Sequence, residues 1–189
     1  ASDARFVETL KRALGDRGIT NTKIVVKDGD EAICDDLAMD REYADAVDII
    51  GLHYPSDFSL LPPTRPKDYF TCHKLGKKFW ASEESSSYDD LNGAACWARI
   101  VNAHWVISQM TSSIMWNLVG SYYHGTNWYA SSMMTADQPW SGHYKVNPVI
   151  WATAHMTQFT RIGWRYLAND QGSGYLPHGG YYATLVDPD

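Results

Sequence analysis

The stretch Lys77-Lys78-Phe79-Trp80-Ala81-Ser82-Glu83-Glu84-Ser85-Ser86-Ser87 passes from charge through a bulky apolar pair to a carboxylate followed by small hydroxyls. A short apolar run with such borders predicts a buried β-strand. In a barrel of alternating strands and helices, the loops after the carboxyl ends of the strands build the active site. A glutamate there can serve as nucleophile, base or metal ligand. A solvated loop acid fits this segment equally well.

Strands and helices alternate on both sides of this stretch. Apolar runs predict further strands at 23–28, 47–54 and 113–120, and helical periodicity predicts helices at 3–15, 30–39, 92–110 and 149–159. The segment 56–67 is rich in proline and is predicted to be a loop. This alternation of near-continuous apolar strands with helices indicates a parallel α/β fold whose sheet is covered on both faces.

The number of units leaves two architectures open. Four strand–helix units cannot close an eight-stranded barrel, so we expect either an open doubly wound sheet or the second half of a (β/α)8 TIM barrel. A helix at the very start, with no strand before it, favours the half barrel, and the opening at Ala1 looks like a cut. We therefore predict that residues 1–162 form a partial TIM-barrel catalytic domain.

The pattern changes after Gly163. Two short strands, Trp164–Leu167 and Tyr181–Val186, flank a turn-rich stretch with no helix between them. Residues 163–189 are therefore predicted to be the first strands of a β-sandwich domain, which the sequence leaves in mid-pattern at Asp189.

Composition excludes several classes of function. The chain has 189 residues, 44% of them hydrophobic, which is enough for one globular core. Its net charge is −6 without a run of basic residues, so we predict no nucleic-acid partner and no electrostatic membrane anchor. No apolar run of 18 residues exists, so no transmembrane segment is predicted. The 8 Trp and 12 Tyr suit either buried aromatic packing or stacking on sugar rings.

Five segments together resemble glycoside hydrolase family 59, the galactosylceramidase family. They are 51–55 (Gly-Leu-His-Tyr-Pro), 79–84 (Phe-Trp-Ala-Ser-Glu-Glu), 116–119 (Trp-Asn-Leu-Val), 133–144 (Met-Met-Thr-Ala-Asp-Gln-Pro-Trp-Ser-Gly-His-Tyr) and 157–160 (Thr-Gln-Phe-Thr). The resemblance runs in order from about Val25 to the C-terminal end. It implies a (β/α)8 barrel, a β-sandwich and a lectin-like domain, with the four strands here as the fifth to eighth of the barrel.

The resemblance also implies a reaction. It is retaining hydrolysis of a terminal β-galactoside, most of all galactosylceramide, by two carboxyl groups about 5–5.5 Å apart. Glu83 falls on the nucleophile position. The acid/base, a glutamate normally preceded by asparagine, would lie upstream of Ala1. No metal or organic cofactor is expected. Because that acid is missing and half of the barrel strands lack neighbours, we expect the isolated chain to be inactive and poorly stable.

Other positions receive roles with their alternatives open. Glu84 also carries a carboxylate, but adjacent strand residues point to opposite faces and the family assigns the nucleophile to the first acid. Ser86 matches a sugar-contacting position or is an ordinary turn serine. Trp116 is expected to form an aromatic platform under the sugar, the alternative being core packing. His53 and Tyr54 end a strand, and either could hydrogen-bond the nucleophile or be buried and structural. Trp128 departs from the tyrosine of mammalian members and leaves aglycone preference open.

The three cysteines form no CxxC pair, which excludes zinc-finger and thioredoxin-type motifs. Cys96 matches a family cysteine that pairs beyond Asp189, which implies an oxidising compartment. Cys34 and Cys72 are expected to be buried free thiols. The resemblance further implies a lysosomal or secreted location and a saposin-type lipid carrier as partner. Two other functions remain open: hydrolysis of a β-galactoside in a poly- or oligosaccharide, and non-catalytic carbohydrate binding.

Overall fold

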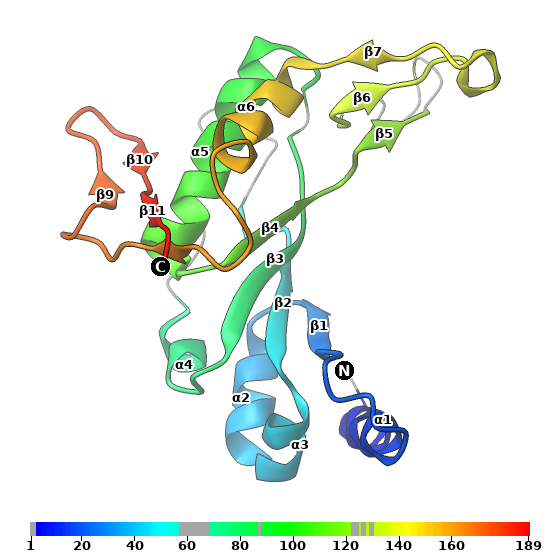
Figure 1. Cartoon of the computed structure of the whole chain (residues 1–189), viewed down its shortest axis with the longest axis vertical. Helices are drawn as coiled ribbons and strands as arrows, with labels where there is room; N and C mark the ends of the chain where they lie inside the picture. The colour runs from blue at the N-terminus through cyan, green and yellow to red at the C-terminus, as the bar shows by residue number, and fades with distance from the viewer. Residues whose placement is uncertain (1–2, 57–68, 87, 122–124, 126–127, 129–130) are drawn as a thin grey trace.

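The computed structural model describes residues 3–56, 69–86, 88–121, 125, 128 and 131–189 (Figure 1). At its centre lies a four-stranded sheet of β1 (Val25–Gly29), β2 (Ile49–His53), β3 (Lys78–Glu84) and β4 (Ser112–Met115). All three neighbouring pairs are parallel, and the strands lie in chain order. A doubly wound sheet reverses its strand order at a switch point, whereas a barrel keeps the chain order. The parallel α/β prediction is confirmed.

Helices lie before, between and after these strands, and the four longer ones were predicted from the sequence. They are α1 (Ala4–Asp16), α2 (Ala32–Met39), α3 (Arg41–Ala46), α4 (Phe70–His73), α5 (Leu91–Ser108) and α6 (Pro148–Thr157). Asp3 begins α1 by accepting hydrogen bonds from two backbone N–H groups, and Asp90 does the same for α5. The sequence analysis missed α3 and α4, which are too short to show helical periodicity. Most of the predicted proline-rich loop, residues 57–68, lies outside the described residues.

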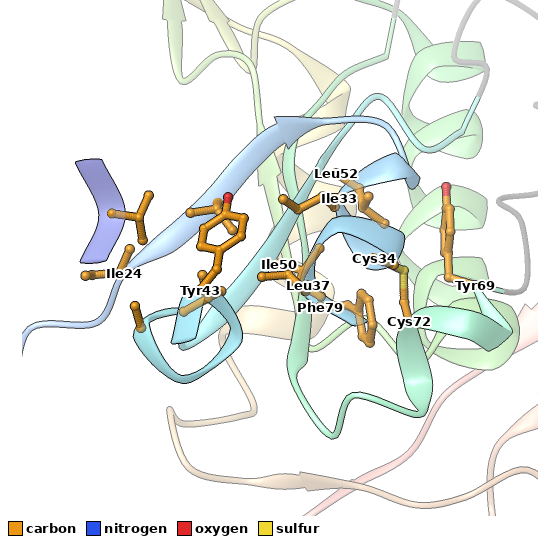
Figure 2. Packing of buried hydrophobic residues seen from close by; sticks show 14 of the residues in the cluster. Ile24, Ile33, Cys34, Leu37, Tyr43, Ile50, Leu52, Tyr69, Cys72 and Phe79 are labelled. Carbon is orange, nitrogen blue, oxygen red and sulfur yellow. A yellow bond between two sulfur atoms is a disulfide. The ribbon is translucent and has the colours of Figure 1, made fainter. Parts of the chain in front are cut away.

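The larger hydrophobic core lies between the sheet and the first helices (Figure 2). Val26, Ile50 and Phe79 are register partners on β1, β2 and β3, and each is at most 6% exposed. Ile33 and Leu37 of α2 pack against them. Each such side chain contributes roughly 1.5–3 kcal/mol when fully buried. This burial fixes which face of the sheet carries helices and which is left for a site.

Cys34 of α2 and Cys72 of α4 form a disulfide, drawn as a yellow bond in Figure 2. The prediction of two free thiols is therefore wrong. Their sequence separation is 38 residues, and their Cα atoms come within 5.0 Å because α2 and α4 pack against the same face of the sheet. Neither spacing nor local pattern could show this. Cys96, buried in α5 within a second cluster that includes Trp97 and Val149, lies outside that disulfide.

The predicted strand at 113–120 divides in two. β4 ends at Met115, and β5 (Val119–Gly120) joins a separate sheet with β6 (Met134–Thr135) and β7 (Lys145–Val146). Between β6 and β7 lies a 3-10 helix, η1 (Pro139–Ser141). Figure 1 shows this small sheet extending away from the parallel one. The chain therefore leaves the parallel sheet at Trp116.

The C-terminal segment forms two short antiparallel pairs: β8 (Arg165–Tyr166) with β11 (Leu185–Val186), and β9 (Gly174–Tyr175) with β10 (Tyr181–Tyr182). The predicted strand at 181–186 is thus two strands with different partners. Trp105 of α5 stacks on Tyr166 at 4.6 Å between ring centroids, and its Nε1 donates to the Leu167 carbonyl at 2.8 Å. The segment is anchored on α5. Its assignment to a β-sandwich, and the boundary at 162/163, stay predictions.

Among the described helices, none has both the length and the apolar character to cross a bilayer.

Candidate active site

The candidate site lies at the carboxyl ends of β1, β2 and β3, which the parallel sheet places at one edge. Glu83, at the end of β3, accepts a hydrogen bond on Oε1 from the Tyr54 hydroxyl at 2.7 Å. His53 places its Nε2 3.5 Å from the same oxygen. The Glu83 side chain is 30% exposed and that of His53 is 40% exposed, so both are open to a ligand. Three of the predicted site residues therefore meet at one point.

A β-bulge decides which of the two adjacent glutamates faces this site. Phe79 and Ala81 point into the core, so strict alternation would send Glu83 to the core as well. The pairing with β2 instead runs Leu52 to Ala81 and then His53 to Glu83, with two residues of β3 against one of β2. This extra residue reverses the alternation. Glu83 consequently turns to the site face, and Glu84 is fully buried on the core side.

The bulged Ser82 reaches across β2 to a residue that the sequence analysis missed. Its hydroxyl donates to Asp28 Oδ1 at 2.7 Å, although β2 lies between β1 and β3. Gly51 of β2 permits this crossing, because a Cβ there would lie 2.8 Å from the Ser82 Oγ. Asp28 is itself skipped in the pairing of β1 with β2. The Asp28 carboxylate thus joins Tyr54 and His53 at the edge of the sheet where Glu83 lies.

Two backbone positions at this edge are strained. Asp28 has φ 55° and Tyr54 has φ 46°, values that residues other than glycine rarely adopt. Such conformations cost about 1–3 kcal/mol each and persist where surrounding contacts hold them. The Tyr54 N–H donates to the Glu83 carbonyl at 2.8 Å, which is one such contact. In this conformation the Tyr54 side chain reaches the Glu83 carboxylate.

Glu84 lies in a polar network beneath the site. Its Oε2 accepts from the Ser56 N–H at 3.1 Å and lies 3.3 Å from His104 Nε2, and its Oε1 accepts from the Ser85 N–H at 3.1 Å. His104, on α5, places Nδ1 2.7 Å from the Ser113 hydroxyl of β4. Glu84 and His104 are both 0% exposed. Glu84 is therefore out of reach of a ligand in the site, in contrast to Glu83.

The remaining predicted residues differ in their placement. Trp116 follows β4 and is half-buried, and its backbone N–H donates to the Glu84 carbonyl at 2.7 Å, which places it beside the end of β3. Ser86 is 0% exposed, and its hydroxyl donates to the Gly93 carbonyl at 3.0 Å. The structure thus brings Trp116 to the site edge, and it directs Ser86 toward the first turn of α5. Trp128 is 56% exposed, in a loop only partly described.

Asp28, His53 and Glu83 each offer one ligand atom within 4.8 Å of the others, a spacing that could hold a cation. Exposed carboxylates commonly gather in this way without one, and the sequence predicted no metal. The position of Asp28 could have been found, because it ends the strand predicted at 23–28 as Glu83 ends its own. His104 gave no such signal, since a histidine within an apolar helix is typical of core packing.

Comparison with known proteins identifies the family of the chain. Residues 1–158 match the model of "Glycosyl hydrolase family 59". The chain is 42% identical over 187 residues to a galactocerebrosidase of Danio rerio, covering 99% of this chain and 26% of that protein. It is 40% identical over 186 residues to the galactocerebrosidase of Homo sapiens, covering 98% of this chain and 25% of that protein. The chain thus spans about a quarter of the length of these relatives.

Two solved structures resemble the fold. SrfJ from Salmonella typhimurium has a TM-score of 0.67 and 16% identity, with 98% of this chain and 45% of that chain covered. A glycoside hydrolase family 30 subfamily 8 xylanase from Clostridium acetobutylicum has a TM-score of 0.61 and 17% identity, with 86% and 37% covered. At such identities the likeness concerns the fold, which in both is TIM-barrel-like. By its match over residues 1–158, the chain belongs to glycosyl hydrolase family 59.

Proposed function

We propose that the full-length protein is a retaining glycoside hydrolase that cleaves terminal β-galactosides, above all galactosylceramide. The observation that carries this proposal is the carboxylate of Glu83, partly exposed at the end of a parallel strand and hydrogen-bonded by Tyr54 at 2.7 Å. Membership of family 59 and the galactocerebrosidase relatives support the substrate.

In the proposed mechanism, a Glu83 oxygen attacks the anomeric carbon of the galactoside, and the bond to the aglycone oxygen breaks. A carboxylic acid from outside this sequence protonates the leaving oxygen, and its carboxylate then takes a proton from water. That water displaces Glu83 and releases β-galactose. Tyr54 and His53 both contact the Oε1 atom of Glu83, which holds the carboxylate in one orientation. No step requires a metal or cofactor.

Substrate contacts follow from the same edge of the sheet. Trp116 would provide the aromatic face on which the apolar side of galactose stacks. Asp28 presents a carboxylate within 4.8 Å of Glu83, where it can accept hydrogen bonds from sugar hydroxyls. The Ser86 hydroxyl, predicted to contact the sugar, donates to the Gly93 carbonyl here, so contact would require it to rotate.

The nucleophile assignment is tested in the full-length protein by turnover of an aryl β-galactoside. Glu83→Gln is expected to lower kcat by roughly 10³-fold or more, whereas Glu42→Gln, on the exposed surface of α3, serves as a matched control and leaves it unchanged. In Glu83→Ala, added azide should restore turnover and give the α-galactosyl azide. Normal turnover by Glu83→Gln would refute the proposal, and a folded wild type that binds galactosides without hydrolysis would favour the binding function.

The aglycone is tested separately. Galactosylceramide in detergent and a soluble galacto-oligosaccharide are compared by kcat/KM with the same enzyme. A higher value for the lipid supports the sphingolipid assignment, and a higher value for the oligosaccharide indicates a galactan-degrading enzyme instead.

We also propose a lysosomal or secreted location, with a saposin-type carrier presenting the lipid. The Cys34–Cys72 disulfide supports an oxidising compartment, because structural disulfides persist there and are rare in the cytosol. A pairing of Cys96 beyond Asp189 would agree with this. Stimulation of galactolipid turnover by an added saposin, with no effect on a soluble aryl galactoside, would identify the carrier.

A further inference from the structure

A buried polar pair, Glu84 and His104, lies next to the candidate site. The buried pair of Glu84 and His104 takes no part in the mechanism above. Both side chains are 0% exposed, and their closest atoms, Oε2 and Nε2, are 3.3 Å apart. A buried carboxylate is costly unless donors surround it, so a site of this kind calls for a physical explanation.

The polar groups around Glu84 come from three separate elements. Ser56, in the loop after β2, donates its backbone N–H to Oε2, and Ser85 donates its own to Oε1. His104 approaches from α5. His104 Nε2 also lies 3.2 Å from the Ser56 hydroxyl, and its Nδ1 lies 2.7 Å from the Ser113 hydroxyl. One carboxylate thus joins the loop after β2, the end of β3, the helix α5 and, through His104, the strand β4.

This network sits directly behind the nucleophile. Glu84 is the next residue after Glu83, and the bulge in β3 sends the two side chains to opposite faces. Fixing the Glu84 side chain therefore fixes the peptide that carries Glu83. The same residue accepts the Trp116 N–H on its backbone carbonyl at 2.7 Å, and the Ser85 hydroxyl donates to the Trp116 carbonyl at 3.0 Å. The Glu84–Ser85 segment therefore positions both Glu83 and Trp116.

The other titratable group affected by Glu84 is Tyr69, on the same buried side. Burial, followed by the negative charges of Glu31 and Glu84, raises the pKa of Tyr69 to about 12. Tyr69 therefore remains a neutral phenol beside the network at neutral pH.

From this geometry we propose that Glu84 and His104 are positioning residues: they lock the bulged end of β3 so that the Glu83 carboxylate meets the Tyr54 hydroxyl and Trp116 lies beside it. The inference rests on the proposed function of Glu83. It assigns a role to Glu84, the second acid of the Glu-Glu pair. Glu84 is buried and does not contact the substrate.

The test compares Glu84→Gln and Glu84→Asp in the full-length enzyme, with core variants Ile33→Val and Leu37→Ala as controls that lose stability without touching the network. Intact sites are counted with a slow covalent galactosyl inhibitor, and kcat is expressed per intact site well below the melting temperature. We expect Glu84→Gln to lose at least tenfold in kcat with KM changed less than twofold. Glu84→Asp should recover part of that loss, and the core variants should keep kcat per site.

Equal kcat per site in Glu84→Gln and wild type would overturn the proposal, as would an equal loss in the core variants. A crystal structure of the Glu84→Gln variant gives a second reading that needs no catalysis. A Glu83 carboxylate still 2.7 Å from the Tyr54 hydroxyl, as it is here, would also overturn it. Failure of the proposed function gives a different result: wild type would then lack galactosidase turnover, or Glu83→Gln would keep it.

Discussion

Glu83 and Glu84 are neighbours in sequence and lie in opposite surroundings. Glu83 faces the open edge of the sheet, where its side chain is 30% exposed and is oriented by Tyr54 and His53. Glu84 faces the helices, is 0% exposed and is enclosed by backbone N–H groups and His104. The same chemical group is thus available for reaction on one face and committed to structure on the other. What separates them is one extra residue in β3.

The comparison predicts a large effect on stability at Glu84 and a small one at Glu83. Glu84→Ala removes the acceptor from buried donors and should lower the free energy of unfolding by about 3–5 kcal/mol, the range for breaking a buried pair. Glu83→Ala removes a partly exposed carboxylate and should change it by about 0.5 kcal/mol or less. Urea unfolding followed by tryptophan fluorescence measures both. Equal losses in the two variants would mean that the two faces do not differ as described.

The Cys34–Cys72 disulfide lies on the helix-covered face of the sheet, as Glu84 does. Replacing both Cys34 and Cys72 by serine should lower the free energy of unfolding by about 2–4 kcal/mol, because the unfolded chain gains freedom. Turnover per intact site should stay the same, since neither cysteine contacts the edge of the sheet that carries Glu83. Thermal melts with and without reductant provide the measurement. A variant as stable as wild type would indicate that this disulfide does not form in the protein.

On the site face, Tyr54→Phe tests the orientation of the nucleophile. The hydrogen bond to Glu83 Oε1 is 2.7 Å long, and its loss should lower kcat by roughly ten- to a hundredfold. The free energy of unfolding should hardly change, because the hydroxyl is not part of the core. Steady-state kinetics with an aryl galactoside give the comparison with Glu84→Gln. Unchanged kcat would show that Tyr54 does not orient the nucleophile.

The smallest effect is expected at the opposite end of β2. Asp48 accepts from the Ile24 N–H at 3.0 Å and lies 3.0 Å from the Lys11 ammonium. Partial burial works to raise the pKa of Asp48, but the Ile24 N–H and Lys11 outweigh it and hold the pKa below its ordinary value of 3.8. The stability that ionised Asp48 adds is therefore fully present above about pH 4, and it is lost as the pH falls through the lowered pKa of Asp48.

Asp48→Asn should consequently lower stability modestly, by about 1 kcal/mol or less at neutral pH, and flatten the loss of stability below pH 4. Turnover should be unaffected, since residues at the amino ends of barrel strands serve stability rather than catalysis. Thermal melts across this pH range test the prediction. A marked fall in kcat would show that the two ends of the sheet are not separated in function.

Sequence patterns were sufficient for the parallel order of the strands, the four longer helices and the position of Glu83 at a strand end. These features depend on local periodicity and on punctuation by glycine and proline. The bulge in β3 depends instead on the pairing of β2 with β3, where Gly51 leaves room for Ser82 to reach Asp28. No local pattern in residues 79–84 encodes that pairing.

Other differences between prediction and structure have the same cause. The apolar run at 113–120 looks like one strand, but the chain leaves the parallel sheet at Trp116 and Val119 pairs with Met134 in another sheet. Cys34 and Cys72 meet only because α2 and α4 share a face. His104 becomes a partner of Glu84 through packing of α5 on the sheet. Each depends on contacts between residues distant in sequence, which local patterns do not specify.

The most direct measurement is to identify the residue that becomes covalently attached to the sugar. The full-length enzyme is incubated with 2-deoxy-2-fluoro-β-galactosyl fluoride, whose fluoride leaves without acid assistance and whose fluorine at C2 slows hydrolysis of the glycosyl ester. Peptide mass spectrometry should then locate the ester on Glu83, with Glu84 unmodified. An ester on Glu84 or Asp28, or hydrolysis without any labelled carboxylate, would contradict the assignment of Glu83 as the nucleophile.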